Sequence, residues 1–149
     1  MSEHMRVARA YEAALFAGRM DEVGSYFTDD IRYWVAGEPP LGGTWRGRAA
    51  VLGAFANREF GLGAADWGDE DLERTWYDAD DRVIVEIHEK SWLKDAPDDV
   101  MDQRTCVVIR FAGDRICEMR DYSDSHLYQL FVARHRARLP KFASGSAAR

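Results

Sequence analysis

Two acidic side chains interrupt apolar, strand-like patterns. In residues 82–93 the odd-numbered side chains are apolar until Glu89, and in residues 115–122 Asp121 lies on the same side as Met119. Because side chains alternate across a strand, both carboxyl groups are expected to face an apolar interior. Burial raises the pKa of a carboxyl group and suits it to acid–base catalysis. The alternative is that both groups lie at strand ends and reach solvent or a salt bridge.

Two tyrosines could supply a hydroxyl to the same interior. Tyr33 shares one face of a strand pattern with Ile31 and Val35, and Tyr11 lies on the apolar stripe of the first helical segment. A tyrosine hydroxyl can donate a hydrogen bond to a substrate oxygen, although a core tyrosine bonded to a neighbour fits the pattern too. We predict Asp121, Glu89 and Tyr33 as catalytic residues, with Tyr11 beside them.

The wall of the predicted pocket comes from apolar positions that share a face with these groups. Aromatic residues make up 12% of the chain, a content that suits a ligand cavity. The predicted lining residues are Tyr11, Val35, Phe55, Val85, Ile87, Thr105, Val107, Ile109 and Met119.

Hydrophobic periodicity predicts the elements that position these residues. Helices are expected at 3–18, 21–27 and from 47 to about 61, with a final helical segment at 125–138. Strands are expected at 31–35, 72–76 running into 82–93, 104–111 and 115–122, joined by connections at 37–43, 64–71 and 94–102. This order predicts one soluble α+β domain over residues 1–142, with a curved antiparallel sheet wrapped around helices and enclosing an apolar pocket. Residues 143–149 are small and polar and are expected to be disordered.

Composition excludes several classes of function. A net charge of −6 and a pI near 5.2 argue against general nucleic-acid binding, which depends on clustered basic residues. The sequence has neither an apolar stretch long enough to span a membrane nor the apolar core of a signal peptide, so the cytoplasm is expected. Cys106 and Cys117 are expected to be reduced core thiols, and we expect neither a metal site nor a cofactor.

Three segments carry a resemblance to a known superfamily. Residues Tyr11–Gly18, Phe27–Tyr33 and Arg120–Asp124 resemble those of SnoaL-like polyketide cyclases, ketosteroid isomerases and limonene epoxide hydrolases, which share a nuclear-transport-factor-2-like fold. The likeness extends from about residue 5 to residue 131. It implies the cone-shaped fold, but this fold hosts many chemistries and non-catalytic relatives.

The branches of the superfamily place different residues in the pocket. Ketosteroid isomerases resemble this chain at Tyr11, but Val35 and Val107 stand where their acids would be. Limonene epoxide hydrolases resemble it at Asp121 and Tyr33, with Glu89 replacing one Asp. Their Arg position holds Ile87 and their Asn position holds Val35. SnoaL-like cyclases use one Asp as general base, and Asp121 looks like its counterpart.

Three functions follow as hypotheses. The first is cyclisation or isomerisation of a small hydrophobic, polyketide- or terpenoid-like molecule, with Asp121 as general base, Glu89 as acid–base partner and Tyr33 polarising the substrate oxygen. The second is an epoxide hydrolase in which Glu89 and Asp121 activate water. The third is a non-catalytic ligand-binding or dimerisation module.

The resemblance also implies a homodimer that pairs through the outer face of the sheet. Trp34, Trp92 and Val108 are predicted to lie on that face.

Overall fold

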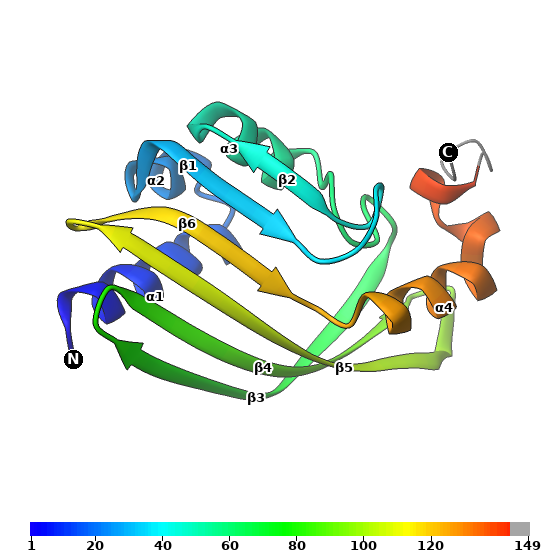
Figure 1. Cartoon of the computed structure of the whole chain (residues 1–149). Coiled ribbons are helices and arrows are strands. Elements are labelled where there is room, and N and C mark those ends of the chain that lie inside the picture. The colour runs from blue at the N-terminus through cyan, green and yellow to red at the C-terminus, as the bar shows by residue number, and fades with distance from the viewer. Residues whose placement is uncertain (144–149) are drawn as a thin grey trace.

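The computed structural model describes residues 1–143 and shows an α+β fold built on one open, curved sheet of six strands (Figure 1). The strand order is β2-β1-β6-β5-β4-β3. Helices α1 to α3 lie behind the sheet in Figure 1, and α4 lies at its far end, beyond β6. This arrangement confirms the predicted fold class. The elements are α1 (Glu3–Phe16), α2 (Met20–Ser25), β1 (Phe27–Val35), β2 (Gly43–Arg46), α3 (Arg48–Ala56), β3 (Trp67–Ala79), β4 (Arg82–Leu93), β5 (Ala96–Ala112), β6 (Arg115–Tyr122), α4 (Ser125–His135) and two short 3-10 turns (Arg136–Arg138 and Pro140–Phe142).

The sheet departs from the expected antiparallel meander at one ladder. Strands β3, β4, β5 and β6 pair successively in antiparallel fashion, and β2 pairs antiparallel with β1. Strand β6 returns beside β1 and runs parallel to it, with Val35 opposite Asp121. Parallel neighbours need a long crossover, and the whole segment from β2 to β5 provides it here.

Two apolar clusters fill the space between the helices and the sheet. The larger one joins α1 and α3 to strands β1, β4, β5 and β6, and the smaller one lies at the α4 end around Phe131 and Leu93. Helix α1 begins at Ser2, whose side chain accepts a hydrogen bond from the Met5 amide, and buries Val7 and Ala14 on one stripe.

Several predicted boundaries were wrong because backbone pairing extends strands into polar sequence. Residues 28–30, between the helix expected at 21–27 and the strand expected at 31–35, belong to β1, and residues 67–71 and 96–102 belong to β3 and β5 rather than to connections. Strand β2 begins at the last residue of the connection expected at 37–43 and was not predicted, and α3 ends at Ala56, before the expected end at about residue 61. Acidic residues of β3 are exposed at the edge of the sheet, where charge discourages pairing with another chain.

The cysteines are free, as expected, but they are not core thiols. Both are partly exposed. Cys106 lies opposite Glu86 and Tyr122, in register with the outer face of the sheet. Cys117 lies where a bulge shifts the β5–β6 register, so that Ile116 instead of Cys117 is buried opposite Phe111.

None of the helices in residues 1–143 is long and apolar enough to cross a membrane. The disorder predicted for residues 143–149 falls, apart from Ala143, outside the described residues.

Gly42 is a position where the loop between β1 and β2 requires glycine. A Cβ atom there would lie 2.4 Å from the carbonyl oxygens of Val35 and Ala36, which are backbone atoms that cannot turn aside. We expect Gly42→Ala to lower the free energy of unfolding by roughly 1–3 kcal/mol. Gly53→Ala, in helix α3 with open space around its Cβ position, should raise it by about 0.5–1 kcal/mol. Urea denaturation of the two variants checks this pair, and equal stabilities would contradict it.

Candidate active site

A cavity of about 760 Å³ lies between the inner face of the sheet and the helices. Its wall includes residues from α1, α3 and α4 and from strands β1, β3, β4, β5 and β6. All the predicted site residues line it, so the structure brings together side chains that are up to 110 positions apart in sequence (Tyr11 to Asp121). They are Tyr11, Tyr33, Val35, Phe55, Val85, Ile87, Glu89, Thr105, Val107, Ile109, Met119 and Asp121.

The Asp121 carboxyl group is held against the wall by Tyr33. Tyr33 lies opposite Met119 in the β1–β6 ladder, and its hydroxyl donates to Asp121 Oδ2 at 3.4 Å. Asp121 Oδ1 is enclosed and has no hydrogen-bond partner within residues 1–143. Burial raises the pKa of Asp121 to about 6, against the opposing effect of the Tyr33 hydrogen bond. The group is therefore a carboxyl that can both accept and release a proton near neutral pH.

Aromatic packing fixes the position of the Tyr33 hydroxyl. The Tyr33 ring is 5% exposed and lies 5.1 Å from the Phe55 ring and 5.4 Å from the Phe60 ring, between centroids. Burial and the nearby Asp121 charge raise the pKa of Tyr33 well above its usual value. Tyr33 therefore remains protonated and acts as a hydrogen-bond donor.

Tyr11 supplies a second hydroxyl from helix α1. Its side chain is 6% exposed and its ring packs on Phe27, with centroids 5.6 Å apart. Burial is the main cause that raises the pKa of Tyr11, so this group is a neutral donor as well.

Glu89 is the second acid of the cavity, and an amide holds it. Gln103 Nε2 donates to Glu89 Oε1 at 2.8 Å. Burial, together with the negative charges of Asp71 and Asp69, raises the pKa of Glu89 to about 7, against the opposing effect of Arg74. Two carboxyl groups with pKa values near neutrality in one apolar cavity can serve as base and acid in the same reaction.

Besides the lining residues Arg58, Ser91, Ser123 and Ser125, sequence reasoning missed four polar residues that form ion pairs or side-chain hydrogen bonds around this cavity. Glu12 and Arg74 form an ion pair between α1 and β3, and both line the cavity. Arg74 also pairs with Asp71 at 2.8 Å.

Gln103 and Tyr128 are the other two. Gln103 has the same parity as Thr105 and Val107, so extending the alternation by one more inner position would have found it. Tyr128 lies one helical turn before Phe131 on α4, a spacing that places both on one face. The cross-strand position of Arg74, opposite Ile87, follows from the β3–β4 register, which a bulge after Asp71 shifts and which the sequence pattern did not reveal.

No group of three or more His, Cys, Asp or Glu side chains in the described part of the chain could hold a metal ion.

Solved structures with the same fold include proteins of several descriptions. An NTF2-like protein from Burkholderia xenovorans is 19% identical, with a TM-score of 0.73 over 86% of this chain and 94% of that one. An epoxide hydrolase of the limonene epoxide hydrolase type from M. tuberculosis is 20% identical, with a TM-score of 0.63 over 89% and 90%. A protein with a ketosteroid isomerase-like fold from Catenulispora acidiphila, solved in complex with trimethylamine, is 23% identical, with a TM-score of 0.56 over 78% and 83%.

A search of curated proteins found no match. Comparison with protein families matches residues 7–119 to the SnoaL-like domain, a span that contains most of α1, all of α2, α3 and β1 to β5, and most of β6. The chain therefore belongs to the SnoaL-like family.

Proposed function

We propose that this protein is a cofactor-independent enzyme that isomerises or cyclises a small hydrophobic carbonyl compound. The observation that carries the proposal is that Asp121 and Glu89, two carboxyl groups with raised pKa values, line the same apolar cavity. Asp121 is the general base, Glu89 is the acid–base partner and Tyr33 polarises the substrate oxygen.

The reaction begins with removal of a proton from the carbon next to the carbonyl group. Asp121 accepts this proton, and negative charge develops on the carbonyl oxygen, where tyrosine hydroxyls can donate hydrogen bonds. In an isomerisation Glu89, protonated in part at neutral pH, donates a proton to a second carbon. In a cyclisation the carbanion attacks a second carbonyl group of the substrate, and Glu89 protonates the alkoxide oxygen that forms as the new carbon–carbon bond closes the ring. Each such positioned proton transfer contributes about 10²–10⁴-fold to the rate.

The charges around Glu89 favour this reaction over epoxide hydrolysis. Arg74, a cation of the cavity wall, pairs with Glu12 and Asp71 rather than bridging Glu89 and Asp121. Water activation by two carboxylates without a bridging cation brings like charges together unmediated. A purely ligand-binding role is disfavoured because burying carboxyl groups costs free energy that such a role does not need.

Exchange of hydrogen for deuterium at the carbon next to a carbonyl group tests the proposed base, and it does not require the natural substrate to be known. We expect the protein to accelerate this exchange in 2-tetralone dissolved in D₂O. Asp121→Asn should lower the rate at least about 100-fold, since an amide cannot accept the proton. Asp102→Asn, on the outer face beside His88, is the matched control and should retain the rate. NMR of the recovered ketone measures the exchange.

Two results would count against the proposal. One is an exchange rate that Asp121→Asn leaves unchanged. The other is conversion of epoxides to diols that carry oxygen from labelled water, which would identify hydrolysis instead.

The raised pKa of Asp121 also predicts a pH-dependent stability difference. The carboxyl group ionises near pH 3.8 in the unfolded chain and near pH 6 in the folded protein. Between these pH values the folded protein binds more protons than the unfolded chain. The amount by which Asp121 lowers the free energy of unfolding therefore grows as pH rises from about 4 to about 6 and then levels off. Asp121→Asn should therefore match the wild type near pH 4 and exceed its free energy of unfolding by up to about 3 kcal/mol at pH 7.5. Urea denaturation of both proteins from pH 4 to pH 7.5 measures this difference. A difference in free energy of unfolding that does not change with pH would contradict the prediction.

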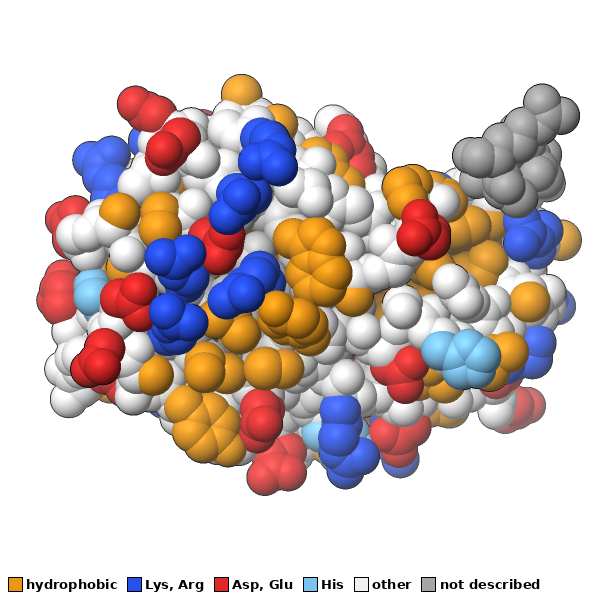
Figure 2. Space-filling view, in the orientation of Figure 1, with side chains coloured by type: hydrophobic (Ala, Val, Ile, Leu, Met, Phe, Trp, Pro, Cys, Tyr) orange, Lys and Arg blue, Asp and Glu red, His pale blue; other side chains and the backbone are white. Residues whose placement is uncertain are grey.

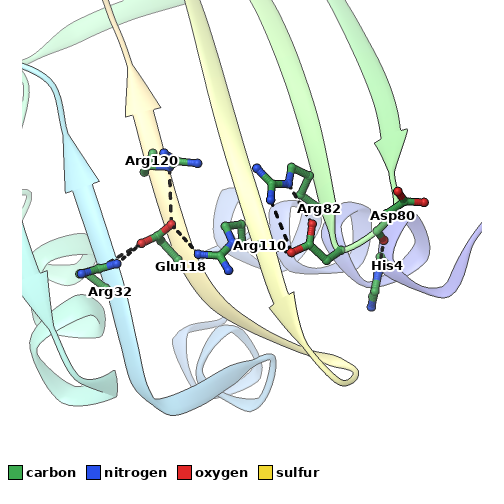
Figure 3. Close-up of polar contacts among 8 residues, drawn as sticks. His4, Arg32, Asp80, Arg82, Arg110, Glu118 and Arg120 are labelled. Carbon is green, nitrogen blue, oxygen red and sulfur yellow. Dashed lines mark hydrogen bonds and ion pairs between the residues drawn. The ribbon is translucent and has the colours of Figure 1, made fainter.

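We also propose that two copies pair through the outer face of the sheet. One row of side chains that lie opposite one another across β1, β6, β5, β4 and β3 is largely apolar on this face. The row runs from Trp34 through Arg120 to Val108, Ile84 and Tyr77. Figure 2 shows apolar and basic side chains side by side on this face. In the adjacent row Arg32 and Arg110 contact Glu118, which Arg120 also approaches from the apolar row (Figure 3). Trp92, also predicted to lie in this interface, packs over Gly68 of the neighbouring strand.

Analytical ultracentrifugation tests the pairing. The protein should sediment as a dimer at micromolar concentration, and Val108→Asp should convert it to a monomer because the charge would be buried in the interface. Leu130→Asp, at an exposed position on helix α4, should leave the dimer intact. A monomeric wild-type protein would overturn the proposal.

A further inference from the structure

A second hydrogen-bonded unit lies at the cavity beside the Tyr33–Asp121 pair, and two of its members, Glu89 and Tyr128, line the cavity wall. Gln103, on β5, is 2% exposed, and its Nε2 atom donates both to Glu89 Oε1 at 2.8 Å and to the Tyr128 hydroxyl at 3.1 Å. Glu89 comes from β4, where it lies opposite Gln103, and Tyr128 comes from α4. One buried amide therefore connects a carboxyl group and a phenol that belong to different elements of the fold.

The amide orientation follows from the chemistry of its partners. When Glu89 is ionised its carboxylate can only accept hydrogen bonds, so in this state the NH₂ group of Gln103, which carries two hydrogens, faces it. Its second hydrogen then reaches the oxygen of Tyr128, which accepts. The Tyr128 hydroxyl hydrogen is not used in this bond and remains available to a ligand. Among residues 1–143, Gln103 is the one side chain that donates to Glu89, and it does so at Oε1, so Oε2 remains available as well.

The unit lies close to the proposed reaction centre. Glu89 and Tyr128 both line the cavity. Tyr128 is within electrostatic range of both Glu89 and Asp121, and burial raises the pKa of its phenol above the usual value. Tyr128 is therefore neutral and can donate a hydrogen bond close to the carboxyl groups.

We propose that Gln103 is a positioning residue that fixes the Glu89 carboxyl group and makes Tyr128 a hydrogen-bond donor to a carbonyl oxygen of the substrate. This inference rests on the proposed function, because it assigns Tyr128 as a hydrogen-bond donor to a carbonyl oxygen that the substrate of the proposed isomerisation would carry. It adds a specificity determinant: ligands with an acceptor oxygen at this point are bound, and equally apolar ligands without one are discriminated against.

The first experiment measures the pKa of Glu89 in the ligand-free protein by ¹³C NMR. Gln103→Met keeps the length and approximate volume of the side chain but removes both hydrogen bonds. Losing a donor to the charged form should raise the pKa of Glu89 by about one unit. Tyr128→Phe keeps the Gln103–Glu89 bond and should leave this pKa nearly unchanged. The other charged groups that act on Glu89, which are Asp69, Asp71 and Arg74 of β3 and Asp121 of β6, are the same in both variants.

A merely structural role for Gln103 predicts a different outcome. Gln103→Met would then lower the melting temperature without moving the pKa of Glu89, and that result would overturn the positioning role. If the Met variant does not fold, Gln103→Asn, which keeps the amide but is too short to reach both partners, should raise the pKa of Glu89 in the same direction.

The second experiment observes the carbonyl group of a bound probe. The C=O stretching frequency of 2-acetylnaphthalene falls when its oxygen accepts a hydrogen bond, so it should be lower in the wild-type cavity than in hexane. Tyr128→Phe and Gln103→Met should shift it back toward the hexane value. Tyr26→Phe, which removes a hydroxyl that lies just after α2 and donates to Glu22, should retain the wild-type frequency.

An unchanged frequency in Tyr128→Phe, or no binding of the probe at millimolar concentration, would overturn the assigned donor role. These readouts are separate from the proposed reaction. If hydrogen exchange survives in Asp121→Asn, the proposed function fails even if Glu89 and the probe respond as expected here.

Discussion

Burial of two carboxyl groups in an apolar cavity, without a cation bridging them, is the constraint on which the chemistry proposed for this protein depends. Strand alternation alone turns Glu89 and Asp121 inward, because each shares a face with apolar neighbours in β4 and β6. Transfer of an ionised carboxylate from water to such a site is costly, and the cost appears as raised pKa values. A carboxyl group that titrates near neutrality is what a general base at physiological pH requires.

Three arginines of the sheet lie on its outer face, away from this pair of acids. Arg32, Arg110 and Arg120 gather around Glu118 on the outer face of the sheet, where they hold the pKa of Glu118 below its usual value although burial opposes them. Arg74 does reach the cavity wall, but Glu12 and Asp71 pair with it. The two faces of one sheet thus have opposite electrostatic character, since outward carboxylates are compensated by guanidinium groups and inward ones by hydrogen bonds from Tyr33 and Gln103.

Much of this site could be predicted from the sequence because parity within a strand is a local property. Val85, Ile87 and Glu89 share a face wherever the strand begins or ends, so the prediction that they point inward does not depend on its exact bounds. Features that depend on pairing between strands were not predictable in this way. The parallel β1–β6 ladder, the bulge that turns Cys117 away from the core and the position of Arg74 opposite Ile87 all depend on register, which long-range packing sets. Gln103 was missed for a simpler reason: the polar start of β5 hid the true beginning of the strand.

The most direct test of this account is a ¹³C NMR titration of the side-chain carboxyl groups in the wild-type protein without ligand. The account predicts that Asp121 titrates near pH 6 and Glu89 near pH 7. Titration of both groups near pH 4, as for carboxyl groups in water, would show that they are not held in a dry cavity and would contradict the proposed acid–base chemistry.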